Sequence, residues 1–236
     1  MRKVTRTLLA AVGIALWVAG ANAQTIVLDQ QQPIINTTAG IVLAIGGGVE
    51  QQRLAQVVTA GITGKLTRVA LAGGCSVGSR LVVTIQGTAF GKPNNVALAS
   101  ATFSGVTGPA GTFNVLTLPT PVQFNAGESF AIVFSTPSPA DSCATWPGPA
   151  GNPYAGGDGY VNSLADPSGS WGVLSYNPGI AAGADLPFQT YVELLPAAAT
   201  AVPTLTPYGL VGLMVMFSAL GAIVLASRAR RACAKR

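Results

Sequence analysis

Short apolar segments that alternate with polar residues recur through residues 24–195, and they constrain the fold more than any other feature of the sequence. In the segment RLVVTIQG every second side chain is aliphatic, and ESFAIVFS and DLPFQTYVEL repeat the pattern with aromatic residues included. A period of two is typical of β-strands with one buried face. The residues predicted to share such faces are Leu81, Val83, Ile85, Phe130, Ile132, Phe134, Leu186, Phe188, Val192 and Leu194.

Turn-forming residues separate these segments at near-regular intervals, for example at 61–64, 91–95 and 125–127. Strands punctuated by Gly, Pro and Asn indicate antiparallel pairing, whereas a parallel sheet would need helices between its strands. No segment of useful length in residues 24–195 has the periodicity of a helix. We therefore predict an all-β ectodomain over residues 24–195, an antiparallel β-sandwich of the jelly-roll type.

A less regular stretch, residues 137–184, interrupts the strand pattern. It is rich in Gly, Pro, Asn and Asp, and aromatic residues are scattered through it. Long irregular stretches in compact domains are often functional. We expect short strands within it at 159–163 and 171–175.

The first 23 residues have the layout of a secretory signal peptide. Three basic residues precede an apolar stretch at 8–18, and an Ala-Asn-Ala sequence ends at Ala23. This order predicts a signal helix at residues 1–23, cleaved between Ala23 and Gln24. The Sec export machinery and signal peptidase are then the expected partners. A buried N-terminal helix is the alternative interpretation.

A second apolar segment lies near the C-terminus. Residues 209–226 carry no charge, and as a helix they would extend about 27 Å, at ~1.5 Å per residue. Five basic residues follow, and positive charge beside a span favours the cytoplasmic side. We predict a linker at 196–207, a transmembrane helix at 208–227 and a basic cytoplasmic tail at 228–236. A buried helix of a soluble domain is the alternative.

A short motif stands at the outer end of this predicted span. It consists of Val202, Pro203, Thr204, Leu205, Tyr208 and Gly209. The motif, helix and basic tail together resemble the IPTL-CTERM type of bacterial sorting signal, with Val in place of Ile and Tyr in place of Trp. The resemblance implies a precursor transiently anchored in the inner membrane, processed by an exosortase-like enzyme, and then a cell-surface or extracellular protein. A plain membrane anchor is the alternative.

Residues 55–193 also resemble secreted bacterial jelly-roll modules, some of which are grouped with carbohydrate-binding-like domains. The resemblance rests on the strand and turn pattern and on the pieces YAGG and FQTYV, so it implies a fold and assigns no binding residue. Two functions remain open for the exported domain. The first, which the low charge and the lack of catalytic groups favour, is a non-catalytic structural or display role at the surface or in the extracellular matrix of a Gram-negative-type bacterium. The alternative is a surface module that binds extracellular polysaccharide.

Charge and composition argue against several other function classes. Within residues 24–195, eight acidic residues outnumber five basic ones, so a nucleic-acid partner is not expected. The sequence contains no histidine, which excludes Ser-His-Asp and Cys-His nucleophiles and every imidazole metal site. Paired carboxylates could hydrolyse glycosides, but the eight acidic residues are scattered in turns, so we expect no enzymatic activity and no cofactor or metal.

Two of the three cysteines, Cys75 and Cys143, lie in the predicted exported region, and Cys233 lies in the basic tail. An oxidising compartment favours a disulfide between Cys75 and Cys143. Both occur in sequences that we interpret as turns. Two separate buried thiols are the alternative, because sequence does not give their separation.

Aromatic residues in the irregular stretch are candidate ligand contacts. The candidates are Trp146, Tyr154, Asp158, Tyr160 and Trp171. Aromatic faces can stack on sugar rings, but Tyr160 and Trp171 also fit as core residues of late strands, with Trp146 covering the Cys143 region. Asp158 fits an Asx turn better than a calcium site with Asp141 or Asp166, because no dense run of oxygen ligands surrounds it.

Overall fold

A computed structural model describes most of the predicted ectodomain and a small part of the C-terminal segment. The chain divides into one compact unit that ends at Leu195 and a second that begins at Pro196. The residues described are 24–38, 40–44, 52–149, 151–163, 169–175, 184–195, 212 and 214–219.

The predicted signal peptide, sorting motif and basic tail lie outside these residues. Of the predicted transmembrane segment, residues 212 and 214–219 are described, and they are helical. No helix in the described part of the chain is long and apolar enough to cross a membrane.

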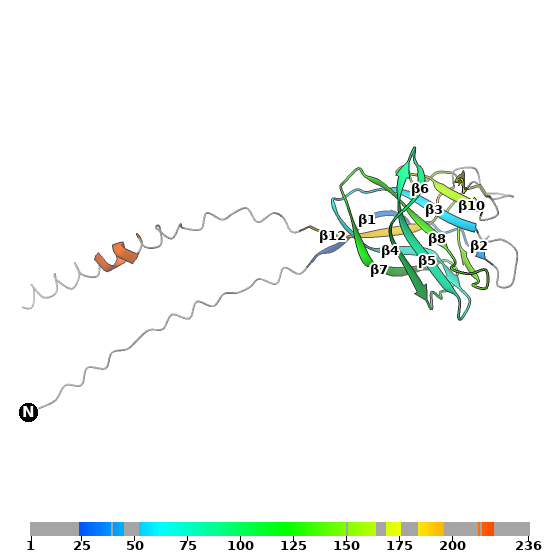
Figure 1. Ribbon diagram of the computed structural model, residues 1–236, viewed down its shortest axis with the longest axis horizontal. Helices are drawn as coiled ribbons and strands as arrows, with labels where there is room; N and C mark the ends of the chain where they lie inside the picture. The colour runs from blue at the N-terminus through cyan, green and yellow to red at the C-terminus, as the bar shows by residue number, and fades with distance from the viewer. Residues whose placement is uncertain are drawn as a thin grey trace, which may run out of the picture. The chain divides into compact units, whose positions relative to one another are not determined.

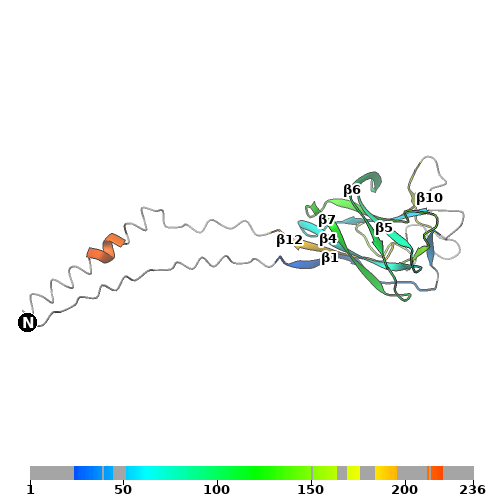
Figure 2. The same cartoon turned by 60° about the horizontal axis from the view of Figure 1, so that its bottom comes forward.

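The first unit is an all-β sandwich of two antiparallel sheets, as predicted (Figures 1 and 2). One sheet has the order β1-β12-β4-β9-β2, with β7 paired to β4, and the other has the order β11-β10-β3-β8-β5-β6. The strands are β1 (Ile26–Gln32), β2 (Ile41–Ala44), β3 (Gln52–Thr59), β4 (Gly64–Cys75), β5 (Arg80–Ala89), β6 (Lys92–Ser104), β7 (Phe113–Phe124), β8 (Ser129–Ser135), β9 (Cys143–Thr145), β10 (Gly159–Ser163), β11 (Gly172–Val173) and β12 (Phe188–Leu194).

The period-two rows form the core between the sheets. The rows predicted on β5 and β8 are buried and belong to one cluster with apolar residues of β4, β7 and β12. Burying such side chains contributes roughly 1.5–3 kcal/mol each, which makes this layer the main source of stability. Leu194 is an error in the predicted row of β12: it is 36% exposed, because β12 ends there.

The second sheet is also buried on part of its outer face. Ala55 and Val57 of β3, with Ala131 and Val133 of β8, pack in a separate cluster that includes Tyr160 and Trp171. The β8 segment FAIVF is therefore buried on both faces. This explains why that segment is apolar without interruption.

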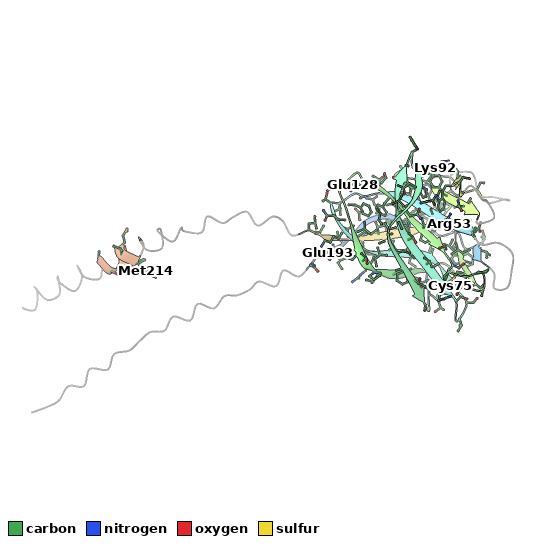
Figure 3. The ribbon with its side chains drawn as sticks, viewed as in Figure 1. Arg53, Cys75, Lys92, Glu128, Glu193 and Met214 are labelled. Carbon is green, nitrogen blue, oxygen red and sulfur yellow. A yellow bond between two sulfur atoms is a disulfide. The ribbon has the colours of Figure 1, made fainter. Side chains whose placement is uncertain are left out.

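The first and last strands are neighbours. Ile26 pairs with Glu193, and the Leu194 N–H donates to the Thr25 carbonyl at 3.0 Å. Leu194 also pairs with Gly64 at the start of β4, so both ends of the described sandwich lie at that end. Cys75 ends the same strand, about 36 Å away at ~3.3 Å per residue. Figure 3 shows Glu193 and Cys75 toward opposite ends of the sandwich.

Candidate functional site at the disulfide end

The predicted disulfide between Cys75 and Cys143 is confirmed, and it marks the disulfide end of the sandwich. The interpretation of both cysteines as turn residues was wrong. Cys75 is the last residue of β4, Cys143 is the first of β9, and the two are direct partners in the pairing of these strands. Such a bond is consistent with an oxidising, extracytoplasmic environment.

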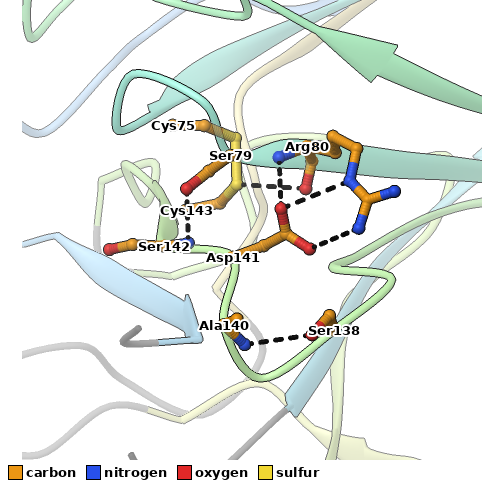
Figure 4. Close-up of polar contacts among 8 residues, drawn as sticks. All are labelled: Cys75, Ser79, Arg80, Ser138, Ala140, Asp141, Ser142 and Cys143. Carbon is orange, nitrogen blue, oxygen red and sulfur yellow. Dashed lines mark hydrogen bonds and ion pairs between the residues drawn. A yellow bond between two sulfur atoms is a disulfide. The ribbon is translucent and has the colours of Figure 1, made fainter. Parts of the chain in front are cut away.

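An ion pair between a buried aspartate and a half-exposed arginine lies beside the disulfide (Figure 4). Asp141 Oδ1 accepts the backbone N–H of Arg80 at 2.8 Å, and Asp141 Oδ2 lies 3.3 Å from Arg80 Nη2. The Asp141 side chain is 6% exposed and the Arg80 side chain 49% exposed. The carboxylate thus fixes the loop before β9 to the start of β5, and its charge is balanced.

An open pocket of about 380 Å³ lies over the disulfide. Its wall combines the two cysteines with apolar, glycine and hydroxyl residues, and none of these described lining residues is charged. They are Val42, Gly74, Cys75, Ser76, Thr107, Gly108, Ser142, Cys143, Ala144 and Trp146.

Trp146 provides the aromatic part of this wall, and the fold holds it in place. Its backbone N–H donates to the Ala72 carbonyl at 2.8 Å, which extends the β4–β9 pairing by one residue. Its six-membered ring packs against Gly40, where a methyl group would lie 3.1 Å from Cζ3. A side chain at position 40 would therefore require the ring to shift by a few tenths of an ångström.

Three hydroxyl side chains line the same pocket. Ser76 and Ser142 are linked through their backbones, because the Ser76 N–H donates to the Ser142 carbonyl at 2.8 Å. Thr107 follows Val106, whose carbonyl accepts the Cys75 N–H at 2.7 Å. Within the described chain, the hydroxyls of Ser76, Thr107 and Ser142 have no protein partner, so they are available to a ligand.

Tyr154 lies in the core and does not line this pocket. It is 8% exposed, and its ring meets Phe188 edge-on, with ring centres 5.0 Å apart. Its hydroxyl accepts the Thr59 N–H at 3.2 Å, and burial raises the pKa of that hydroxyl. Tyr154 is therefore a core residue between the two sheets and has a structural role.

Tyr160 and Trp171 lie in the outer-face cluster of the second sheet. Trp171 Nε1 donates to Asn95 Oδ1 at 3.0 Å, and the Arg53 guanidinium lies 5.4 Å from its ring centre. Asp158 accepts from Asn152 Nδ2 at 2.7 Å and from the Tyr160 hydroxyl at 3.5 Å. The five predicted contacts therefore fall in three places, and Trp146 alone reaches the pocket.

The sequence pattern did not point to the buried polar pair Gln56 and Asp185, both 0% exposed. Gln56 Nε2 donates to Asp185 Oδ1 at 2.9 Å, and the Tyr154 N–H donates to Asp185 Oδ2 at 2.7 Å. The Leu186 N–H donates to Gln56 Oε1 at 2.7 Å, so both ends of the Gln56 amide are bonded. Burial raises the pKa of Asp185 to about 6. A Gln inside the apolar run of β3 was the available signal.

Among the described residues, no group of three or more His, Cys, Asp or Glu side chains could hold a metal ion. Asp166 lies outside the described residues, and Asp141 is bound to Arg80. A comparison with protein-family models and with curated proteins finds no match to this chain. The pocket at the disulfide end is thus characterised by its own geometry: an uncharged, hydroxyl-bearing surface with one aromatic ring.

Proposed function

We propose that this chain is an exported, non-catalytic display protein of a Gram-negative-type bacterial surface or extracellular matrix. Its N-terminal segment directs export through the Sec machinery and is removed by signal peptidase. Its C-terminal segment spans the inner membrane transiently, until an exosortase-like enzyme processes the motif at 202–209. The sandwich is the part delivered to the outside.

The position of the chain ends carries this proposal. Because β1 and β12 are neighbours, both ends of the sandwich lie at the Gly64 end of β4, and the disulfide end is opposite. A module attached through its C-terminus would therefore present the disulfide end outward. The disulfide itself, which forms and persists in oxidising compartments, agrees with this location.

We further infer that the sandwich is a jelly roll. The eight longest strands form two four-stranded sets, β1-β12-β4-β7 and β3-β8-β5-β6, in which strands distant in sequence become neighbours. Two interleaved Greek keys produce this order. The fold suits display, since most of the described strands are paired on both sides and few unpaired strand edges are left to pair with other chains.

The sorting step is tested with two proline variants in cells that carry the processing enzyme. Pro203→Ala changes a residue of the matched motif, and Pro207→Ala changes a residue between its two parts. We expect Pro203→Ala to leave the full-length precursor in the inner-membrane fraction, while Pro207→Ala is processed as the wild type is. Normal processing of Pro203→Ala, measured by mass and fractionation, would contradict the proposal.

A further inference from the structure

The pocket at the disulfide end carries a chemistry that display by itself does not require. We propose that it binds a neutral saccharide, with Trp146 contacting a sugar ring and the hydroxyls of Ser76, Thr107 and Ser142 bonding to the sugar hydroxyls. The assignment concerns the sandwich alone. It goes beyond the display role and does not depend on how the C-terminal segment is processed.

The composition of the wall favours a sugar over a purely apolar or a charged ligand. A pyranose has apolar C–H faces and a rim of hydroxyls, and an indole ring contacts the faces while small hydroxyl side chains bond to the rim. Trp146 and Val42 supply apolar surface, and the three hydroxyl residues supply donors and acceptors. The volume of about 380 Å³ lies within the range of roughly 300–1,000 Å³ common to ligand sites.

The lack of charged residues in the described pocket wall favours a neutral sugar over an acidic one. None of the described lining residues is charged, so a uronic acid would bring a carboxylate without a cation to meet it. Arg80, which lies beside the disulfide, is already paired with Asp141. Removing a carboxylate from water without a partner is costly, so neutral sugars are preferred over their uronic acids.

The wall is rigid, and rigidity reduces the entropy lost on binding. The disulfide joins β4 to β9 beneath the pocket, and backbone hydrogen bonds fix the Ser76–Ser142 and Cys75–Val106 contacts. Trp146 is held by the Ala72 carbonyl and by Gly40. A ligand would therefore meet a surface that is already arranged.

The test uses the full chain purified in a detergent without a sugar headgroup. Neutral disaccharides of glucose, galactose and mannose are titrated by calorimetry, beside disaccharides that contain the matching uronic acids. We expect at least one neutral sugar to bind with a Kd on the order of 0.1–1 mM, and its uronic counterpart at least about tenfold more weakly. Absence of binding by every neutral sugar would overturn the proposal.

Variants locate the site. Trp146→Ala removes the aromatic contact, and Phe90→Ala removes an aromatic residue that is fully exposed on the β5–β6 turn and outside the pocket. Gly74→Val narrows the pocket by another route, because Gly74 is part of the pocket wall. A Cβ at this position would lie in ordinary van der Waals contact with the backbone of Val106 and Gly108. We expect both pocket variants to weaken binding at least tenfold and Phe90→Ala to leave it unchanged.

Two further outcomes would count against a saccharide site. Binding that survives both Trp146→Ala and Gly74→Val would place the sugar elsewhere on the molecule. Self-association of the chain that disappears in Trp146→Ala would assign the pocket to a second copy instead. Circular dichroism of each variant shows whether the sandwich is intact, and Gly74→Val decides the question if Trp146→Ala does not fold.

Discussion

Two buried carboxylates, Asp141 and Asp185, fasten loops to strands in different ways. Asp141, beside the disulfide, accepts a backbone N–H and pairs with a half-exposed arginine. Asp185 lies between the sheets, where it accepts from an amide and a backbone N–H, and no cation of the described chain pairs with it. Asp141 therefore has a cation beside it, whereas burial opposes the charge of Asp185.

The two regions are therefore stabilised by different interactions. At the disulfide end, a covalent bond is the main local constraint, and the ion pair adds little because the Arg80 side chain is half-exposed to water. Around Asp185, each hydrogen bond satisfies a group that has no access to water, so losing one partner is expensive. We expect the two regions to differ in their response to substitution, reductant and pH.

The largest effect should come from removing the disulfide. The double variant Cys75→Ser with Cys143→Ser frees a link between residues 68 positions apart and should lower the free energy of unfolding by about 2–5 kcal/mol. Urea unfolding measures the loss. Reductant should reproduce it in the wild type and leave the variant unchanged, and a wild type insensitive to reductant would contradict the prediction.

The next effect concerns Gln56. Gln56→Leu leaves Asp185 Oδ1 and the Leu186 N–H without their partner in a dry interior, at a cost of about 2–4 kcal/mol at pH 7. The matched control is Gln123→Leu on β7, an exposed position where the change should stay within about 0.5 kcal/mol. Equal effects of the two variants would show that the buried network contributes nothing.

A third prediction uses the raised pKa of Asp185. Its folded-state pKa of about 6 exceeds the ordinary value of 3.8, so the folded state binds the proton more tightly than the unfolded state. The stabilisation is present below pH 4 and is lost as the pH rises through 6, which lowers the free energy of unfolding by about 2–3 kcal/mol. Unfolding in urea at a series of pH values measures this slope.

The control for that slope is Asp185→Asn, which cannot titrate. Asp29, whose pKa burial also raises, remains in both proteins and keeps its own contribution. The difference between the two pH curves therefore isolates Asp185. Parallel curves from pH 4 to pH 7 would refute the assignment.

The smallest effect should come from the ion pair. Arg80→Gln removes the guanidinium but keeps the backbone N–H that donates to Asp141, so we expect a loss of about 0–1 kcal/mol. Asp141→Ala removes the acceptor as well and should cost about 1–3 kcal/mol. If Arg80→Gln were as damaging as Asp141→Ala, the charge and not the backbone contact would hold the loop.

Much of the sandwich could be predicted because its signal is local. The period-two rows on β5 and β8 face the core, and strands occur at 159–163 and within 171–175 as expected. Strands β1 and β9 had no comparable pattern, since β1 passes from three apolar residues into Asp-Gln-Gln-Gln and β9 has three residues. Strands of that kind depend on the neighbour that they pair with.

The candidate site was less predictable. Trp146, Tyr160 and Trp171 occur in the same irregular stretch with similar Gly-rich or polar neighbours, yet Trp146 lines an open pocket and the other two are buried. The strands expected at 159–163 and 171–175 indicated core positions for Tyr160 and Trp171, but no local signal showed that Trp146 would line a pocket. Whether each ring is buried depends on which element packs against it. Trp171 is buried because it packs in the outer-face cluster of the second sheet.

The sequence by itself determined the strand pattern and the two cysteines available for a disulfide, because alternation and residue type act over a few positions of the chain. Tertiary structure alone decided that Asp185 meets Gln56 across 129 positions, and that Ser76, Thr107 and Ser142 meet Trp146 around one pocket. Contacts between distant residues depend on which strands become neighbours, and a period of two is the same whichever neighbour a strand acquires.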